Sequence, residues 1–182
     1  MLDRRNFYIN GKWIKPFKKN DFPVINPSNE EVFATISLGS KEDTDAAIKA
    51  AKNSFSSWKE TSKAERIKLL ERLLENYKKR FDEMAEAMSL EMGSPIDYAI
   101  STHAASGQSH IEDFIIRLKE YKFEENFDDK SNNYIAHEPI GVCGLITPWN
   151  WPINQIALKV IPALATGCTM ILKPSEISPI SG

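Results

Sequence analysis

The chain reads Leu145-Ile146-Thr147-Pro148-Trp149-Asn150-Trp151-Pro152, and a little further on Leu172-Lys173-Pro174-Ser175-Glu176. The first motif follows an apolar run at 142–146 that predicts a buried strand. Pro152 suits the first turn of a helix over 152–165, and Gly167 then precedes a second strand over 169–173. A unit of about 30 residues has the length of a parallel strand–helix–strand crossover. Such sheets bind ligands beyond the carboxyl ends of their strands, where both motifs fall.

Charged residues are scarce around these motifs. The chain has 23 Lys and Arg and 25 Asp and Glu, but only four of them lie in residues 134–182: Glu138, Lys159, Lys173 and Glu176. A segment this poor in charge is typical of the covered interior of a domain. We therefore expect the chain to be a fragment of a larger protein, or to need a partner that buries this end.

Two strand pairs are expected near the amino terminus. Residues 7–14 place apolar runs on both sides of Asn10-Gly11, a strong signal for a two-residue hairpin turn. A second pair is expected around residues 26–29, with alternating apolar residues after them.

Three helices should follow. Ser40 with Asp43 and Ser62 with Glu65 have the spacing of helix-capping pairs, and the second pair opens a long helix that ends at Gly93. The third helix is expected from about residue 95 to 119.

Residues 122–139 resemble a projecting hairpin arm with a polar turn at 128–132. Exposed strand edges tend to pair with another chain, so we expect the arm to support a homo-oligomer. The predicted fold class is α/β, with three segments. They are hairpins and helices of a cofactor-binding domain (1–121), the oligomerisation arm (122–139), and an incomplete first strand–helix–strand unit of a Rossmann-like parallel sheet (140–182).

The overall composition narrows the class of protein. A hydrophobic content of 42% and a net charge of −2 are typical of a globular protein and argue against nucleic acid or a membrane as partner. No signal peptide or membrane span is recognisable. Cys143 and Cys168 form neither a disulfide framework nor a metal-ligand spacing, so a cytoplasmic setting and no metal are expected.

Asn150 offers the first candidate for chemistry. A neutral amide can donate to a developing oxyanion without titrating, and one such donor is worth about 3–4 kcal/mol in the transition state. The alternative is a turn asparagine that caps the helix near Pro152. From the isolated residue the cap is favoured, and the two roles are compatible.

Lys173 and Glu176 offer the second candidate. At a strand end their charges could bind the hydroxyls of a ribose, and the carboxylate would repel a 2′-phosphate, favouring NAD over NADP. The alternative is an exposed ion pair, worth at most about 1 kcal/mol. Spacing alone favours the ion pair, and no glycine-rich phosphate loop is visible.

The other reactive residue types have simpler explanations. The two cysteines are expected to be core thiols, because nothing near them in sequence would lower their pKa. His103 and His110 are expected on the surface of the third helix. Trp149 and Trp151 could wall a substrate channel or simply pack.

Ile146–Pro152 and Gly167–Glu176 together strongly resemble the aldehyde dehydrogenase family. Tyr8-Ile9-Asn10-Gly11, Asn26-Pro27, Glu65-Arg66 and Glu91-Met92-Gly93-Ser94-Pro95 extend the resemblance over essentially the whole chain.

The resemblance implies oxidation of an aldehyde to a carboxylic acid with NAD, through attack by a cysteine thiolate. Asn150 would hold the oxyanion, and Lys173 and Glu176 the adenosine ribose. The backbone of Ile146, Thr147, Pro148 and Trp149 would line the cofactor cleft.

In family members the nucleophilic cysteine and the general-base glutamate lie beyond the position of Gly182, and neither Cys143 nor Cys168 matches the nucleophile. We therefore expect the chain alone to be inactive. The alternative is a non-catalytic short module that oligomerises with a full-length enzyme or regulates it.

Overall fold

The computed structural model describes residues 1–128 and 132–182. Two parallel strands, β8 (Val142–Ile146) and β9 (Thr169–Lys173), are joined by helix α6 (Pro152–Ala165). Val142 pairs with Thr169 and Ile146 with Lys173. The strand–helix–strand prediction is confirmed, and both strands end at one edge.

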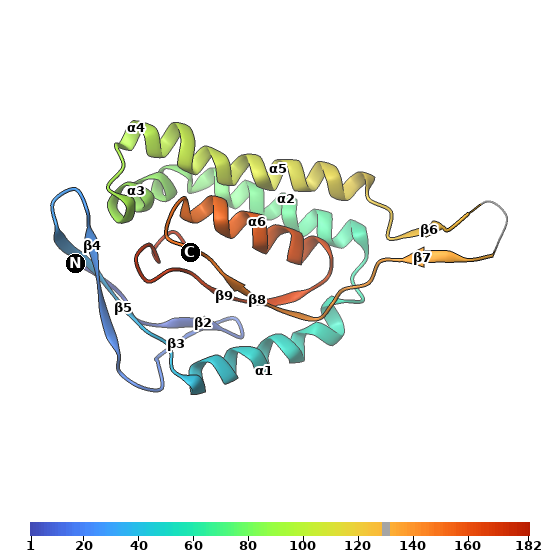
Figure 1. The fold of residues 1–182 in the computed structure, drawn as a ribbon, viewed down its shortest axis with the longest axis horizontal. Coiled ribbons are helices and arrows are strands. Elements are labelled where there is room, and N and C mark those ends of the chain that lie inside the picture. The colour runs from blue at the N-terminus through green and yellow to red at the C-terminus, as the bar shows by residue number, and fades with distance from the viewer. Residues whose placement is uncertain (129–131) are drawn as a thin grey trace.

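Helices cover both faces of this sheet. Figure 1 shows α6 on one face and α1 (Lys41–Trp58) on the other. The hydroxyl of Thr169 donates to the Ala51 carbonyl of α1 at 2.9 Å. Helices α2 (Lys63–Lys79) and α5 (Ala105–Glu120) pack outside α6.

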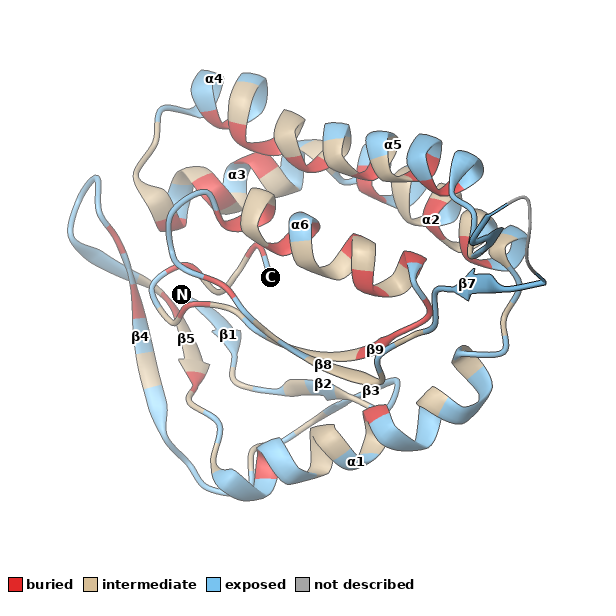
Figure 2. Cartoon of the chain, turned by 45° about the vertical axis from the view of Figure 1, so that its right-hand side comes forward, coloured by how far each residue is buried: buried red, intermediate tan, exposed pale blue. Residues whose placement is uncertain are grey.

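The main apolar core lies between the helices. Figure 2 shows buried residues on the helix faces that meet. The buried residues of this core include Leu70, Met88, Ile111, Ile115, Ile156 and Ile161. Gly107 permits the close approach of α5, because a Cβ there would lie 2.5 Å from the Tyr77 hydroxyl and 2.7 Å from Ile153 Cγ1.

The amino-terminal strands follow the prediction. Strands β2 (Phe7–Ile9) and β3 (Lys12–Ile14) form the expected hairpin, with positive φ at Asn10 and Gly11. Strands β4 (Asp21–Asn26) and β5 (Glu31–Ser37) form the second pair. Strand β1 (Leu2–Arg4), which pairs in parallel with β5, was not predicted.

Both predicted capping pairs are present. Ser40 and Asp43 open α1, and Ser62 and Glu65 open α2, each with reciprocal side-chain and backbone hydrogen bonds. The prediction of one helix running on to Gly93 is wrong. Arg80 leaves the helical conformation (φ −113°, ψ 19°), so α2 ends at Lys79 and α3 (Phe81–Met92) follows.

The charges beside this break suit two helix ends. Lys78 and Lys79 lie in the last turn of α2, and Asp82 and Glu83 lie in the first turn of α3. Cations stabilise a helix carboxyl end and anions an amino end.

The third predicted helix is present but is not uniform. Helix α4 (Ile96–Tyr98) leads into a π-helical segment, η1 (Ala99–Ala104), and then into α5. The Tyr77 hydroxyl donates to the Ala104 carbonyl at 2.8 Å, where the widened turn meets α5. Segments of π-helix are frequent near functional sites.

The arm extends away from the helices as an antiparallel hairpin of β6 (Glu124–Asn126) and β7 (Tyr134–Ala136) (Figure 1). All six strand residues are exposed. The predicted polar turn at 128–132 lies partly outside the described residues, at 129–131.

Candidate functional site

The two motifs meet at the carboxyl edge of β8 and β9. The Thr147 N–H donates to the Lys173 carbonyl at 3.3 Å, which holds the two strand ends together. The chain leaves β8 into residues 147–151 and leaves β9 into residues 174–181. The expectation that both motifs share one edge is confirmed.

Asn150 lies in the exposed turn after β8. The N-cap of α6 is Trp151 rather than Asn150, and no side chain caps this helix. The interpretation of Asn150 as a helix cap is therefore wrong. Its amide makes no hydrogen bond with the part of the chain that the structure describes, so its N–H groups are free to donate to a ligand.

The last residue of β8 and the other residues of this turn differ in exposure. Ile146 and Trp149 are 71% and 55% exposed, and Pro148 is exposed as well. Thr147 is 4% exposed, and its N–H is used in the hydrogen bond to the Lys173 carbonyl. Trp151 adopts a left-handed conformation with φ 55°, unusual for a bulky residue, and this redirects the chain into α6.

Lys173 and Glu176 form an ion pair at the end of β9. Their Nζ–Oε2 distance is 2.8 Å, and the side chains are 60% and 41% exposed. The hydrogen bond from Lys173 lowers the pKa of Glu176, so the carboxylate is ionised at neutral pH. The ammonium group has further donors and the carboxylate further acceptors, which fits the vicinal hydroxyls of a ribose.

The prediction that His103 is a surface residue is wrong. His103 is 3% exposed, and its ring packs edge-on against Tyr98 and Trp151, with centroids 5.2 Å apart in each pair. Burial lowers the pKa of His103, which keeps the imidazole neutral. Its position in the π-helical segment brings its ring into contact with the Trp151 ring. Helical spacing in the sequence did not predict this contact.

His110 is half-buried rather than fully exposed. Its Nε2 lies 2.6 Å from Asn154 Oδ1, which connects α5 with the first turn of α6.

The cysteines are packing residues, as expected. Cys168 is 3% exposed and Cys143 is half-buried. The expectation that nothing lowers their pKa is wrong for Cys168. Burial raises its pKa, but hydrogen bonds from Thr166 and from the backbone of Ile140 and Gly141 outweigh burial and lower it. Burial still shields this thiol from an aldehyde.

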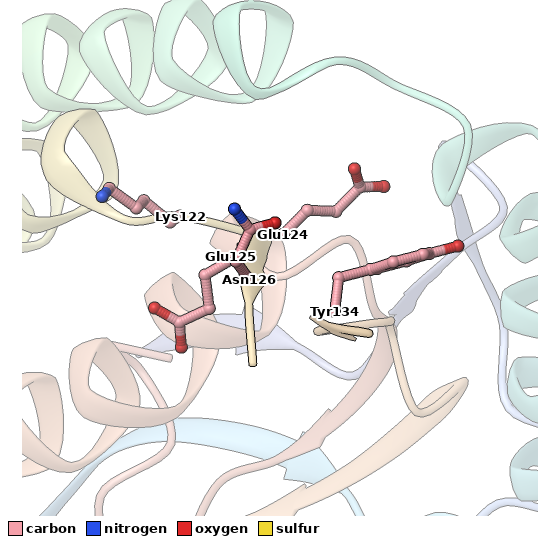
Figure 3. A pocket seen from close by; sticks show the side chains of 5 residues that line it. All are labelled: Lys122, Glu124, Glu125, Asn126 and Tyr134. Carbon is pink, nitrogen blue, oxygen red and sulfur yellow. The ribbon is translucent and has the colours of Figure 1, made fainter. Parts of the chain in front are cut away.

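Two open hollows lie elsewhere on the molecule. One, of about 720 Å³, lies on the arm between Lys122, Glu124, Glu125, Asn126 and Tyr134 (Figure 3). The other, of about 530 Å³, adjoins Arg66, Phe123 and His137. Neither is lined by a candidate site residue.

Within residues 1–128 and 132–182, no group of three His, Cys, Asp or Glu side chains could hold a metal ion. No helix in these ranges has the length and apolar character needed to cross a membrane.

Two parallel strands joined by a covering helix, with polar residues at their carboxyl ends, define an α/β architecture whose ligands bind at that edge of the sheet. Residues 13–182 match the aldehyde dehydrogenase family. The chain belongs to this family.

Relatives match over the whole chain. It is 47% identical over 182 residues to 3-succinoylsemialdehyde-pyridine dehydrogenase of a Pseudomonas species, covering 100% of this chain and 38% of that protein. It also resembles the crystal structure of aldehyde dehydrogenase from Bartonella henselae, with a TM-score of 0.98 and 53% identity. That match covers 100% of this chain and 38% of the other.

A similar structure contains NAD+. Betaine aldehyde dehydrogenase from Staphylococcus aureus in complex with NAD+ has a TM-score of 0.89 and 34% identity, over 99% of this chain and 36% of that one. The chain thus spans little more than a third of the length of these relatives.

Proposed function

We propose that this chain is the amino-terminal part of an NAD-dependent aldehyde dehydrogenase. In that enzyme it supplies the oxyanion donor and part of the cofactor site. The observation that carries the proposal is the free, exposed amide of Asn150 at the same sheet edge as Lys173 and Glu176. Family membership and the NAD+ complex of the Staphylococcus aureus relative support it.

The proposed reaction begins when a cysteine thiolate, supplied by the protein beyond Gly182, attacks the aldehyde carbonyl. Negative charge then develops on the carbonyl oxygen, and the Asn150 Nδ2–H donates to it. An amide does not titrate near neutral pH, so this donor is available whatever the protonation of its neighbours. A glutamate, also beyond Gly182, activates the water that releases the acid.

The end of β9 and the residues that follow it are suited to bind the adenosine ribose of NAD+. Glu176 accepts from the vicinal hydroxyls and Lys173 donates to one of them. The Glu176 carboxylate would repel the 2′-phosphate of NADP+, which favours NAD+. NAD+, when bound, is the acceptor of the hydride that the aldehyde carbon loses.

Asn150→Ala tests the proposal in the enzyme that carries this chain together with its downstream sequence. We expect kcat to fall about 100-fold to 1000-fold, because the oxyanion loses its donor. The Kd for NAD+ should not change. The matched control is Asn53→Ala, an exposed asparagine of α1. A kcat for Asn150→Ala close to that of the control would contradict the proposal.

The 182-residue chain alone should not oxidise aldehydes. NAD-dependent turnover by the purified chain, with Cys143 and Cys168 both changed to serine, would show that it needs no external nucleophile. The downstream nucleotide sequence separates the fragment from the alternative, a short module that oligomerises with a full-length enzyme or regulates it. An open reading frame that continues with a Cys motif and a Glu motif would support the interpretation as a fragment. An immediate stop codon would support the interpretation as a short module.

The arm is the proposed contact with a second copy. Both strands of the β6–β7 hairpin are exposed, and each has an outer edge that could pair with another strand. A dimer or tetramer is therefore proposed. A sizing measurement on the intact protein that gave a monomer would remove this part of the proposal.

A further inference from the structure

Glu91, in the last turn of α3, is a buried acid that the proposed reaction does not use. Its side chain is 1% exposed. Within the described part of the chain it has no cationic partner at ion-pair distance. A buried carboxylate without a cation is costly unless several hydrogen bonds satisfy it.

Three donors from one distant segment satisfy this carboxylate. The N–H of Ile180 lies 2.6 Å from one oxygen, and the N–H of Ser181 lies 3.2 Å from the other, which also accepts from the Ser181 hydroxyl. These residues are about 90 positions from Glu91 in the sequence. Glu91 therefore anchors the irregular segment after β9 to α3, where the chain turns back beneath α6 (Figure 1).

The same segment contacts the turn that carries Asn150. Ser178 is 1% exposed, and its hydroxyl donates to the Trp149 carbonyl at 3.0 Å. This carbonyl belongs to the peptide group that leads into Asn150. The anchored segment also contains Glu176, next to the ribose position.

The turn has few constraints of its own. Pro148 has no N–H to donate, and α6 has no side-chain cap. The Ser178 hydrogen bond therefore constrains the plane of the Trp149–Asn150 peptide, which sets the direction of the Asn150 side chain.

We propose that Glu91 is a positioning residue. It holds Ile180 and Ser181, thereby fixes Ser178 against the Trp149 carbonyl, and so aims the Asn150 amide at the oxyanion. The inference builds on the proposed role of Asn150. In addition, a residue of α3 orients the Asn150 amide, and it acts through the segment that follows β9.

A double-mutant cycle tests the inference in the enzyme that carries this chain, at pH 8. Glu91→Gln keeps the shape of the side chain but turns an NH2 group toward N–H donors. We expect kcat to fall about tenfold, with a smaller change in the KM for aldehyde, because misplacing a catalytic group by a fraction of an ångström is costly. Glu86→Gln, an exposed acid on the same helix, is the control and should leave kcat unchanged.

The cycle is completed with Asn150→Ala. If Glu91 acts through Asn150, adding Glu91→Gln to Asn150→Ala should lower kcat by less than about twofold. A purely structural role predicts the same tenfold factor in both backgrounds and would refute the inference. If Asn150→Ala itself has no effect, the proposed function fails instead.

Hydrogen exchange gives a readout independent of turnover. Glu91→Gln should speed exchange of the amides of Ile180 and Ser181, which donate to the Glu91 carboxylate, and Glu86→Gln should not. If Glu91→Gln does not fold, Ser178→Ala removes the link at its other end without disturbing the buried acid, and the same cycle applies. Unchanged kcat in Ser178→Ala would overturn the inference.

Discussion

Replacing Gly167 by alanine should destabilise the chain more than the same substitution at Gly11 or Gly144. Gly167 has φ 82° and follows α6, where its left-handed conformation lets the chain turn into β9. A Cβ at this position would lie 2.5 Å from Arg66 Nη2, 2.7 Å from Cζ and 2.9 Å from Nη1. The new methyl group therefore meets both a backbone penalty and a steric one.

The guanidinium group of Arg66 has little freedom to move. It is 5% exposed and donates to the Thr61 hydroxyl at 3.0 Å and to the Lys59 and Ala165 carbonyls at 2.9 and 3.5 Å. These bonds satisfy carbonyls at the ends of α1 and α6. A shift large enough to admit the methyl group would break at least one of them.

The expected loss is about 3 kcal/mol. A left-handed conformation costs a residue with a Cβ about 1–2 kcal/mol, and overpacking a tight site adds about 1–3 kcal/mol. For a chain of this size each kcal/mol lowers the Tm by about 2–4 °C. Thermal unfolding of Gly167→Ala, followed by circular dichroism, should therefore show a Tm about 6–12 °C below that of the parent.

Two other glycines separate the two contributions. Gly11 has φ 74° but nothing within 4 Å of its Cβ position, so Gly11→Ala meets only the backbone penalty. Gly144→Ala meets neither, since its Cβ position is open and its φ is not positive. Equal losses for Gly167→Ala and Gly11→Ala would refute the argument that Arg66 is held rigidly.

Two further predictions concern charged groups. Burial raises the pKa of Glu91 to about 7 from an ordinary value of 4.5, although hydrogen bonds from Ser181 and Ile180 oppose the shift. The folded state therefore binds this proton more tightly, so stability is lost as the pH rises from about 4.5 through about 7. Urea unfolding at pH 5 and pH 8 should show this loss in the parent and a smaller one in Glu91→Gln, and equal losses would contradict it. Lys173→Ala should change the free energy of unfolding by less than about 1 kcal/mol, since its ion pair is exposed. In the enzyme that carries this chain it should weaken NAD+ binding about tenfold, as expected for a lost charged hydrogen bond, and an unchanged Kd would exclude Lys173 from the ribose site.

Local signals in the sequence were sufficient for most of the elements. The Asn10-Gly11 turn and the two capping pairs depend on neighbours within three residues, and each is present in the structure. The strand–helix–strand unit was equally visible, because an apolar run, Pro152 and Gly167 mark its boundaries.

Features that depend on distant contacts were missed. Arg80 interrupts a helix whose apolar pattern continues on both sides, and the π-helical turn gives no change of period large enough to detect. The burial of His103 depends on Trp151, which lies 48 residues away. The Glu91 anchor requires Ile180 and Ser181, about 90 positions away, and no local pattern in the sequence indicates it.

The position of α1 has a consequence for how the chain folds. The face of α1 that packs on the sheet meets β8 and β9, and the Ala51 carbonyl receives its side-chain hydrogen bond from Thr169, 118 residues later. Contacts of such long sequence separation form slowly, because loop closure costs entropy before the contact stabilises anything. During synthesis at about 5–20 residues per second, α1 therefore emerges several seconds before the strands that cover it. In that interval its apolar face is open to chaperones and to other nascent chains.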